Sequence, residues 1–404
     1  MIRLLPRLTA CVALLSLFAA ADWRQFRGTD NNSATGATVP TTWDPETGEN
    51  VAWKSAVNGA GVSSPIVVGD NVVVTSDSGV KRDRLHVACY DVATGDLRWE
   101  RQFWATGRTF CHPTSAVAAP TPASDGERIF AFYSSNDMIC LDLAGNLLWY
   151  RGLAYDYPAA GNDVGMSSSP VVVGDTVVVQ VENQGESFAA GLDVATGESR
   201  WKRPRTRQAN WSSPAVLRGA EPEQDAVLLQ SGWGISAHDP RTGEPLWKFE
   251  GGSNIIPSPT AIDGIVYLAS GGLTALRPGE SEPEVVWTNE RLGPESASPL
   301  VHQDRVYVIR GGGVLHCGNA QTGEELWDVR LGGNHWGTPV VACEHLYAID
   351  QEGVARVVRV AGEGEGELVA EIEFGESVLA SPAVADGALF IRTGGHLWKI
   401  AETP

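Results

Sequence analysis

The chain has 404 residues, with 49 Asp or Glu against 30 Lys or Arg and a formal net charge of −19. An acidic surface repels nucleic acid and anionic membranes, so we expect neither as a partner. Five cysteines follow residue 21. Their odd number argues against a disulfide framework, and small buried thiols are the simpler expectation.

The first segment, residues 1–21, is typical of a secretory signal. Arg3 and Arg7 form its basic end, an apolar stretch follows, and small residues up to Ala21 fit a cleavage site. Export would leave a mature chain of residues 22–404 with 28 basic against 49 acidic side chains, a net charge of −21. No later segment has the apolar length of a membrane-spanning helix. We therefore expect an exported protein, periplasmic or extracellular.

One motif recurs along the rest of the chain: a small residue, usually an Asp, then Thr-Gly and a Trp at a fixed offset. Its clearest copies are Cys89–Trp99, Gly191–Trp201, Ala237–Trp247 and Cys317–Trp327. A period of 40 to 50 residues in a chain rich in strand-forming residues predicts a β-propeller.

A second marker is a Pro, usually after Ser or Thr, that precedes a short apolar strand. It recurs eight times, at Pro65, Pro122, Pro170, Pro214, Pro259, Pro299, Pro339 and Pro382. Eight marks predict eight blades, each of four antiparallel strands joined by Gly-containing turns. The fold we expect is an all-β, eight-bladed propeller.

The two ends of the chain complement each other. The last unit begins at Pro382 and stops after Ile400, one strand short, whereas Val51–Val57 carries a Trp with no unit of its own. We expect Val51–Val57 to supply the missing fourth strand of the last blade. An N-terminal strand would then close the ring and remove its exposed edges.

The repeated tryptophans suit a wedge between blades, because an indole offers a large apolar ring with one N–H that can reach a carbonyl. We assign this structural role to seven of them: Trp53, Trp99, Trp149, Trp201, Trp247, Trp287 and Trp327. Blade seven has no Trp at this offset, and we expect Ile372 or Phe374 to replace it.

These runs resemble the PQQ-like (pyrroloquinoline-quinone repeat) β-propeller superfamily over residues 22–404. That superfamily includes quinoprotein dehydrogenases, BamB-type outer-membrane assembly lipoproteins and exported repeat proteins without known activity. The stretch Asp22–Gly28, DWRQFRG, is similar to the WPQFRGP opening of the exported group. The resemblance supports the fold more strongly than it supports any one function.

Residues just before each repeat Pro should ring one mouth of the channel, because loops entering the innermost strands share a face. The channel-mouth ligand candidates are Arg108, Asp163, Asn210, Trp211, Asn254, Glu295, His335 and Trp336. This mixed polar and aromatic rim is suited to a small ligand or a peptide. The long connections Gln102–Ala119 and Gly152–Ser168 rise beside it, with Trp104, Tyr155 and Tyr157 as an aromatic lip.

No catalytic set is evident. His112 beside Cys111 has no partner at a recognisable metal-ligand spacing, so we expect no metal site. The function we favour is therefore an exported, non-catalytic binding or scaffold protein that recognises a protein, polymer or small ligand at the channel mouth. We expect a monomer with a protein or polymer partner in the cell envelope.

Two alternatives follow from the resemblance. A BamB-like assembly factor would dock its partner through exposed loops, although the apolar stretch lies after Cys11 rather than before it, unlike a lipid-anchored protein. A PQQ-dependent dehydrogenase would stack the quinone on Trp211 or Trp336.

In that dehydrogenase, Arg108 would meet the PQQ carboxylates, Asn254 and Glu295 would hold calcium, and Asp163 would be the base. No two cysteines are adjacent, whereas such dehydrogenases commonly carry a vicinal pair. We expect no cofactor.

Overall fold

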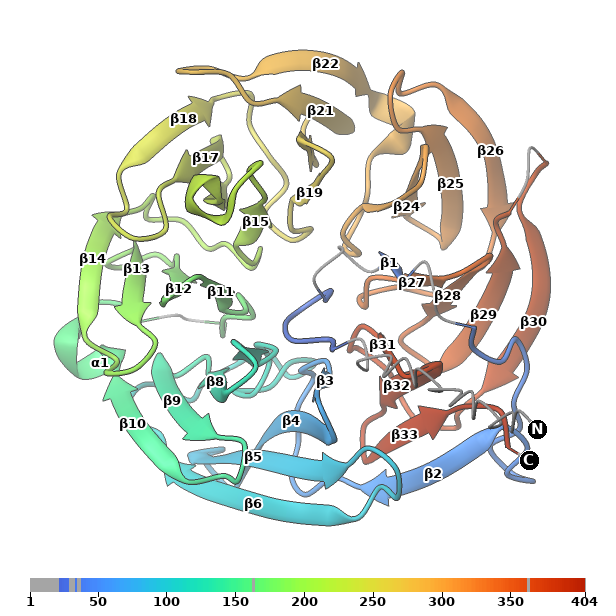
Figure 1. The fold of residues 1–404 in the computed structure, drawn as a ribbon, viewed down its shortest axis with the longest axis horizontal. Coiled ribbons are helices and arrows are strands. Elements are labelled where there is room, and N and C mark those ends of the chain that lie inside the picture. The colour runs from blue at the N-terminus through green and yellow to red at the C-terminus, as the bar shows by residue number, and fades with distance from the viewer. Residues whose placement is uncertain (1–21, 29–32, 35–37, 162–163, 362–363, 404) are drawn as a thin grey trace, which may run out of the picture.

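The computed structural model describes residues 22–28, 33–34, 38–161, 164–361 and 364–403. Its strands form eight sheets arranged around one axis (Figure 1). The prediction of an all-β, eight-bladed propeller is confirmed. The predicted signal segment 1–21 lies outside the described residues.

Each of the first four blades follows a Pro of the repeat and runs outward from its innermost strand in sequence order. Blade one is β3 Ile66–Val68, β4 Asn71–Ser78, β5 Arg84–Asp91 and β6 Leu97–Trp104; blade two is β7 Ala123–Ser124, β8 Arg128–Phe132, β9 Asp137–Asp142 and β10 Leu147–Gly152. Blade three is β11 Val171–Val173, β12 Thr176–Val181, β13 Phe188–Asp193 and β14 Ser199–Pro204; blade four is β15 Ala215–Leu217, β16 Ala226–Ser231, β17 Gly234–His238 and β18 Pro245–Phe249.

The next three blades repeat this order. Blade five is β19 Thr260–Ile262, β20 Ile265–Leu268, β21 Leu273–Arg277 and β22 Glu284–Asn289; blade six is β23 Leu300–His302, β24 Arg305–Arg310, β25 Val314–Asn319 and β26 Glu325–Arg330. Blade seven is β27 Val340–Ala342, β28 His345–Ile349, β29 Val354–Arg359 and β30 Glu367–Glu373. Helical turns are few and short: α1 Leu153–Asp156, η1 Pro222–Gln224 and η2 Glu290–Leu292.

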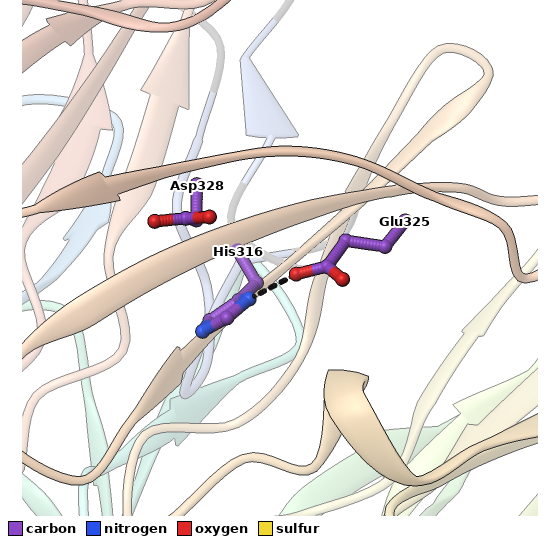
Figure 2. Close-up of side chains that lie close together, drawn as sticks. All are labelled: His316, Glu325 and Asp328. Carbon is purple, nitrogen blue, oxygen red and sulfur yellow. Dashed lines mark hydrogen bonds and ion pairs between the residues drawn. The ribbon is translucent and has the colours of Figure 1, made fainter.

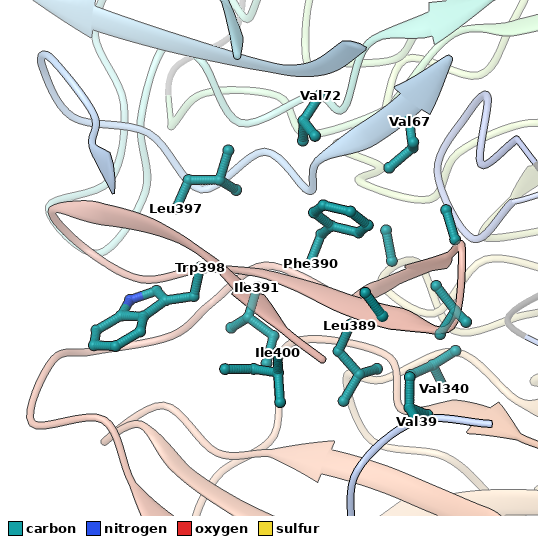
Figure 3. Close-up of a cluster of buried hydrophobic side chains, with 14 of the residues drawn as sticks. Val39, Val67, Val72, Val340, Leu389, Phe390, Ile391, Leu397, Trp398 and Ile400 are labelled. Carbon is teal, nitrogen blue, oxygen red and sulfur yellow. The ribbon is translucent and has the colours of Figure 1, made fainter. Parts of the chain in front are cut away.

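Blade eight joins the two ends of the chain. Its strands β31 Ala383–Ala385, β32 Ala388–Arg392 and β33 His396–Ile400 are completed by β2 Val51–Ala56, which pairs antiparallel with β33. Buried side chains from this blade and its neighbours fill the seam (Figure 3). The predicted closure by an N-terminal strand is therefore confirmed.

The closing segment also supplies a further copy of the repeat turn, Asp44–Gly48, which is not among the predicted copies. The Asp44 carboxylate accepts the N–H groups of Glu46 and Thr47, at 2.8 and 3.1 Å. The Asp91 carboxylate binds Ala93 and Thr94 in the same way. Asp44–Gly48 thus occupies the place of an Asp-x-x-Thr-Gly turn, at the head of the strand that ends the last blade.

Tryptophans join neighbouring blades. The indole N–H of Trp53 donates to the Val92 carbonyl at 3.0 Å, and that of Trp149 donates to Val194 at 3.0 Å. Each ring covers the Gly of the next blade's turn, so that a Cβ on Gly95 would lie 2.6 Å from Trp53. The same donation to the next blade is made by Trp99, Trp201 and Trp287. Trp247 and Trp327 are buried at the equivalent positions.

Blade seven differs from the expectation about its missing Trp. In blade one, Cys89 of the third strand pairs with Trp99 of the fourth. The equivalent pair in blade seven is Val357 and Ala370, so an Ala stands where the other blades have Trp. Ile372 is only partly buried beside the core. Phe374 lies beyond the end of the strand, where its ring contacts Trp43 and Trp398 with centroids 5.9 and 5.2 Å apart. Neither residue takes the Trp position. Phe374 instead packs against blade eight from a position just beyond the end of β30.

Candidate functional site

A closed ring of hydrogen bonds surrounds the channel. In every blade the residue before the repeat Pro is Ser or Thr, and its hydroxyl accepts the backbone N–H of the equivalent residue in the preceding blade, at 2.9 to 3.1 Å. The eight members are Ser64, Thr121, Ser169, Ser213, Ser258, Ser298, Thr338 and Ser381. We call them the hydroxyl ring. The ring fixes the spacing of the innermost strands and sets hydroxyls around the axis.

Above this ring lies a cup with a volume of about 470 Å³. The hydroxyl ring forms its lower wall, and the upper wall takes the residue two positions earlier in each blade. These upper residues are Val62, Ala119, Ser167, Trp211, Ile256, Ser296, Trp336 and Leu379. His112, Thr114, Ser115 and Val164 complete the lining on one side, and Phe26 from the N-terminal segment also lines it. The cup is apolar above, rich in hydroxyls below and open to one face, a form common among ligand sites.

Residues 22–28 lie near the centre of the ring, inside the innermost strands (Figure 1, blue). Trp23 forms a β-bridge with Val67 on the inner edge of blade one. Strand β1, Ser33–Ala34, adds a parallel fifth strand to the inner edge of blade seven. These contacts satisfy backbone groups on inner edges that the channel would otherwise expose.

Arg27 belongs to the same segment and is 3% exposed. Its guanidinium donates to the Pro259 carbonyl at 2.5 Å and to the Thr260 hydroxyl at 2.7 Å, in blade five, opposite the Trp23 bridge. The guanidinium carbon lies 5.5 Å from the centroid of the Phe26 ring. Burial lowers the pKa of Arg27 to about 10, so the side chain remains charged at neutral pH.

Two of the eight channel-mouth candidates line the cup. The Trp211 indole donates to the Gly165 carbonyl at 3.1 Å, and the Trp336 indole to the Gln351 side chain at 3.1 Å. Both rings are therefore held in place at the upper wall.

Asn210, next in sequence to Trp211, points away from the cup. It is buried, and its amide donates to the Glu182 carboxylate at 3.1 Å and to the Gln230 carbonyl at 2.7 Å. Glu182 also forms an ion pair with Arg205 at 2.6 Å, with both side chains at most 5% exposed. Desolvation raises the pKa of Glu182, while Arg205 lowers it. Asn210 thus belongs to a buried polar network between blades three and four.

His335 is also buried beside the cup rather than lining it. Its Nε2 lies 2.9 Å from the Gly332 carbonyl, and burial lowers the pKa of the imidazole. The other ring nitrogen, Nδ1, is buried with no hydrogen-bond partner among the described residues. A neutral, packed histidine fits these surroundings.

Asn254 lines a second, open hollow of about 430 Å³ in which five of the ten lining residues are glycines, and Glu295 follows Pro294 of that lining. The Asn254 amide donates to the Glu295 carbonyl at 3.3 Å. Both side chains are exposed. Arg108 is exposed on the same face as the cup but is not among its lining residues. Asp163 lies outside the described residues.

The long connection after β6 presents an aromatic lip at this mouth. Trp104 and Phe110 are each 62% exposed, and Tyr155, on α1, is 77% exposed. We use "aromatic lip" for these three residues; Tyr157, the third residue expected there, packs on Phe188 instead. The loop is held by hydrogen bonds, including Thr106 to Asp137 at 2.6 Å. Exposed aromatic side chains on an ordered support are typical of a docking surface.

In the part of the chain that the structure describes, one group of side chains has metal-ligand chemistry, on the outer strands of blade six: His316, Glu325 and Asp328 (Figure 2). Both Glu325 oxygens already have partners, His316 Nδ1 at 2.6 Å and Arg291 Nε at 2.7 Å. The arrangement is therefore a compensated ion-pair cluster, distant in the fold from the cup.

The cup does not fit the cofactor that the resemblance implies. PQQ carries three carboxylates, and the resemblance places a calcium ion beside it. Among the described residues, those lining the cup include neither a carboxylate to bind calcium nor a Lys or Arg to bind carboxylates. One guanidinium below the floor cannot match three carboxylates, so we derive no reaction through PQQ.

Comparison with known proteins supports a family. The family model described as outer membrane protein assembly factor BamB matches residues 28–215 and 231–365. The chain is 24% identical over 409 residues to the outer membrane protein assembly factor BamB of Burkholderia pseudomallei (strain K96243), covering 95% of this chain and 94% of that protein.

Two further matches are informative. The chain is 27% identical over 395 residues to a polyvinylalcohol dehydrogenase of a Pseudomonas species, covering 82% of this chain but only 55% of that longer protein. The crystal structure of BamB from Moraxella catarrhalis superimposes with a TM-score of 0.65 at 19% identity, covering 88% of this chain and 98% of that one. The structural match concerns the fold alone.

Proposed function

Because the chain belongs to the family of the outer membrane protein assembly factor BamB, we propose that it is an exported propeller that docks a protein partner of the cell envelope. In this proposal residues 1–21 are a secretory signal and residues 22–404 form the working domain, acting as a monomer. No helix among the described residues is long and apolar enough to cross a membrane.

The observation that carries the proposal is the aromatic lip. Trp104, Phe110 and Tyr155 expose large apolar surfaces on loops that are longer than the other connections and that are tied to the blades. Arg84 lies over the Trp104 ring at 5.5 Å, which keeps the indole oriented. Aromatic residues dominate the energy of protein interfaces, so these three side chains are the contacts expected to matter most.

The test is capture of envelope proteins with a lip variant and a matched control. The lip variant carries Trp104→Ser, Phe110→Ser and Tyr155→Ser. The control carries Leu246→Ser, Val285→Ser and Leu326→Ser, which remove three exposed apolar side chains from outer strands. We expect both variants to melt like the wild type, and only the lip variant to lose an outer-membrane assembly protein that the wild type retains.

Retention of that protein by the lip variant would refute docking at the lip. Failure of the wild type to retain any assembly protein from its own envelope would refute the assembly role as a whole.

A dehydrogenase is the second candidate, favoured by the similarity to polyvinylalcohol dehydrogenase. The described residues that line the cup include no Asp, Glu, Lys or Arg, which weighs against it. Incubation of the pure protein with PQQ and calcium, followed by a dye-linked assay with polyvinyl alcohol and simple alcohols, would decide. Dye reduction that depends on PQQ would establish the dehydrogenase; its absence would remove this candidate.

A further inference from the structure

The cup and the residue beneath it have complementary chemistry. Buried ionised side chains are nearly always paired, since an isolated charge loses its hydration without compensation. Arg27 is 3% exposed, and no described carboxylate forms an ion pair with it. Its two hydrogen-bond acceptors, the Pro259 carbonyl and the Thr260 hydroxyl, are neutral, and its Nε is buried without a partner. The channel therefore holds a positive charge that the described side chains leave uncompensated.

This charge lies close to the cup. Phe26, which lines the cup, has its ring centroid 5.5 Å from the Arg27 guanidinium carbon. Thr260, which binds Arg27, is two residues beyond Ser258 of the hydroxyl ring. A negative group on the floor of the cup would therefore meet the field of this charge through a thin, apolar layer, where electrostatic interactions are weakly screened.

The hydroxyl ring adds donors to the same floor. The hydroxyls of Ser213, Ser258 and Ser298 each accept a backbone N–H from the neighbouring blade. A hydroxyl that accepts one hydrogen bond can still donate its proton. A group that accepts several such protons, and that carries negative charge, suits this floor better than a donor or a cation does.

The upper wall has the opposite character. Trp211 and Trp336 are held by their indole N–H bonds, so their rings face the cup as apolar surface, together with Val62, Ile256 and Leu379. A ligand that fills the cup must therefore be apolar where it meets this wall and negatively charged at its lower end.

We propose that the axial cup binds one carboxylate carried on a compact apolar body, with the carboxylate on the hydroxyl ring above Arg27 and the body between Trp211 and Trp336. Either a free aryl or branched-chain acid or the carboxyl terminus of a polypeptide with an apolar last residue offers this chemistry. The proposal is independent of docking at the aromatic lip, and either can fail alone.

The experiment uses calorimetry on the mature protein with 3-phenylpropionate and its neutral isostere, 3-phenylpropionamide. We expect the carboxylate to bind at least tenfold more tightly than the amide. The variant Arg27→Gln should bind both alike, because it keeps a polar N–H donor on a shorter side chain but removes the charge. Trp336→Ala should weaken both ligands by a similar factor, since it alters only the apolar wall. Equal affinity of the wild type for acid and amide, or no binding of the acid at millimolar concentration, would overturn the proposal.

A second arm separates the sources and does not depend on Arg27→Gln folding. The tripeptide Gly-Gly-Phe with a free carboxyl terminus is compared with Gly-Gly-Phe amide and with 3-phenylpropionate, by the rise in melting temperature of the wild type. A larger rise with the free tripeptide than with either other compound identifies a polypeptide end. A larger rise with 3-phenylpropionate identifies a free acid. Equal shifts with the tripeptide and its amide contradict carboxylate recognition.

Discussion

The indole of Trp201 lies flat against Gly243 of the following blade. Its N–H donates to the Pro240 carbonyl at 2.8 Å, and a Cβ on Gly243 would lie 2.5 Å from the ring. The Thr-Gly of one blade and the Trp of the blade before it are thus two halves of one contact. This pairing explains why both recur at a constant offset.

The first prediction concerns that contact. Gly243 has φ +69° and an indole against it, whereas Gly174 has φ +58° and nothing within 4 Å of its added Cβ. Ala at either position suffers the strain of positive φ, roughly 1 kcal/mol. Gly243→Ala should in addition displace the indole and lower the free energy of unfolding by about 1–3 kcal/mol more than Gly174→Ala. Urea denaturation of both variants measures the difference; equal losses would show that the ring does not need the glycine.

The second prediction separates the indole hydrogen bond from indole packing. Trp201 and Trp327 are both 7% exposed, but only Trp201 has an acceptor for its N–H, because Trp327 Nε1 has none among the described residues. Trp201→Phe should lower the free energy of unfolding by about 1 kcal/mol more than Trp327→Phe does. The comparison of the two denaturation curves tests it, and a greater loss for Trp327→Phe would contradict the assignment.

The third prediction concerns acid. Backbone N–H groups and Arg200 hold the pKa of Asp193 at about 2, below its ordinary 3.8, with the Arg200 hydrogen bond the largest cause. A carboxyl whose pKa is depressed on folding contributes stability above its unfolded pKa and loses it as pH falls through the folded value. The loss should therefore appear between about pH 4 and pH 2. Asn319, which holds the same turn in blade six, is neutral and has no such dependence.

Asp193→Asn should therefore keep the turn but reduce the loss of folding stability as the pH falls. The reverse change, Asn319→Asp, should steepen it. Melting temperatures from pH 7 to pH 2.5 check both; an unchanged slope in each variant would refute the linkage.

The fourth prediction tests the buried pair of Glu182 and Arg205. Arg205→Met leaves the Glu182 carboxylate buried without its cation, which should cost about 3–5 kcal/mol of stability at neutral pH. The double variant Glu182→Leu with Arg205→Met should recover much of that loss. A single variant as stable as the wild type, measured by chemical denaturation, would show that the pair is not desolvated as the structure indicates.

Much of the fold could be predicted because its signals are local and repeated. The Trp offset and the repeat Pro mark the two sides of every blade, and the missing strand after Ile400 points to Val51–Ala56. The Asp44–Gly48 turn has the same letters as the others but was not identified, because one extra residue separates its Gly from Trp53. The repeat was predicted from a constant spacing between its Gly and its Trp, and a one-residue insertion changes that spacing in this copy.

The site was harder to predict, for physical reasons. Asn210 and Trp211 are neighbours in sequence, yet successive side chains of extended backbone point to opposite sides, so one enters a buried network and the other lines the cup. The sequence marks the pair but not which member faces inward. The Ser or Thr before each Pro was recognised only as part of the repeat. Its hydroxyl accepts a hydrogen bond from the neighbouring blade, and this contact exists only when the eight blades form a closed ring.

The position of Arg27 in the structure had no local signal in the sequence. Arg27 meets Thr260 across 233 positions of sequence, and although Thr260 follows the repeat Pro259, nothing in that repeat indicates a distant arginine as its partner. Only the closed ring brings them together, so nothing in the spacing could have placed a cation under the cup.

Because β2 and β33 lie side by side in blade eight, and the Ala401 N–H donates to the Asn50 carbonyl at 3.1 Å, the two ends of the domain are fastened within one sheet. A mechanical load applied between Asn50 and Ala401 would act first on that single sheet and reach the other seven only after it parts. Blade eight is thus the sheet that closes the ring. The force needed to separate its strands would set the mechanical stability of the whole propeller.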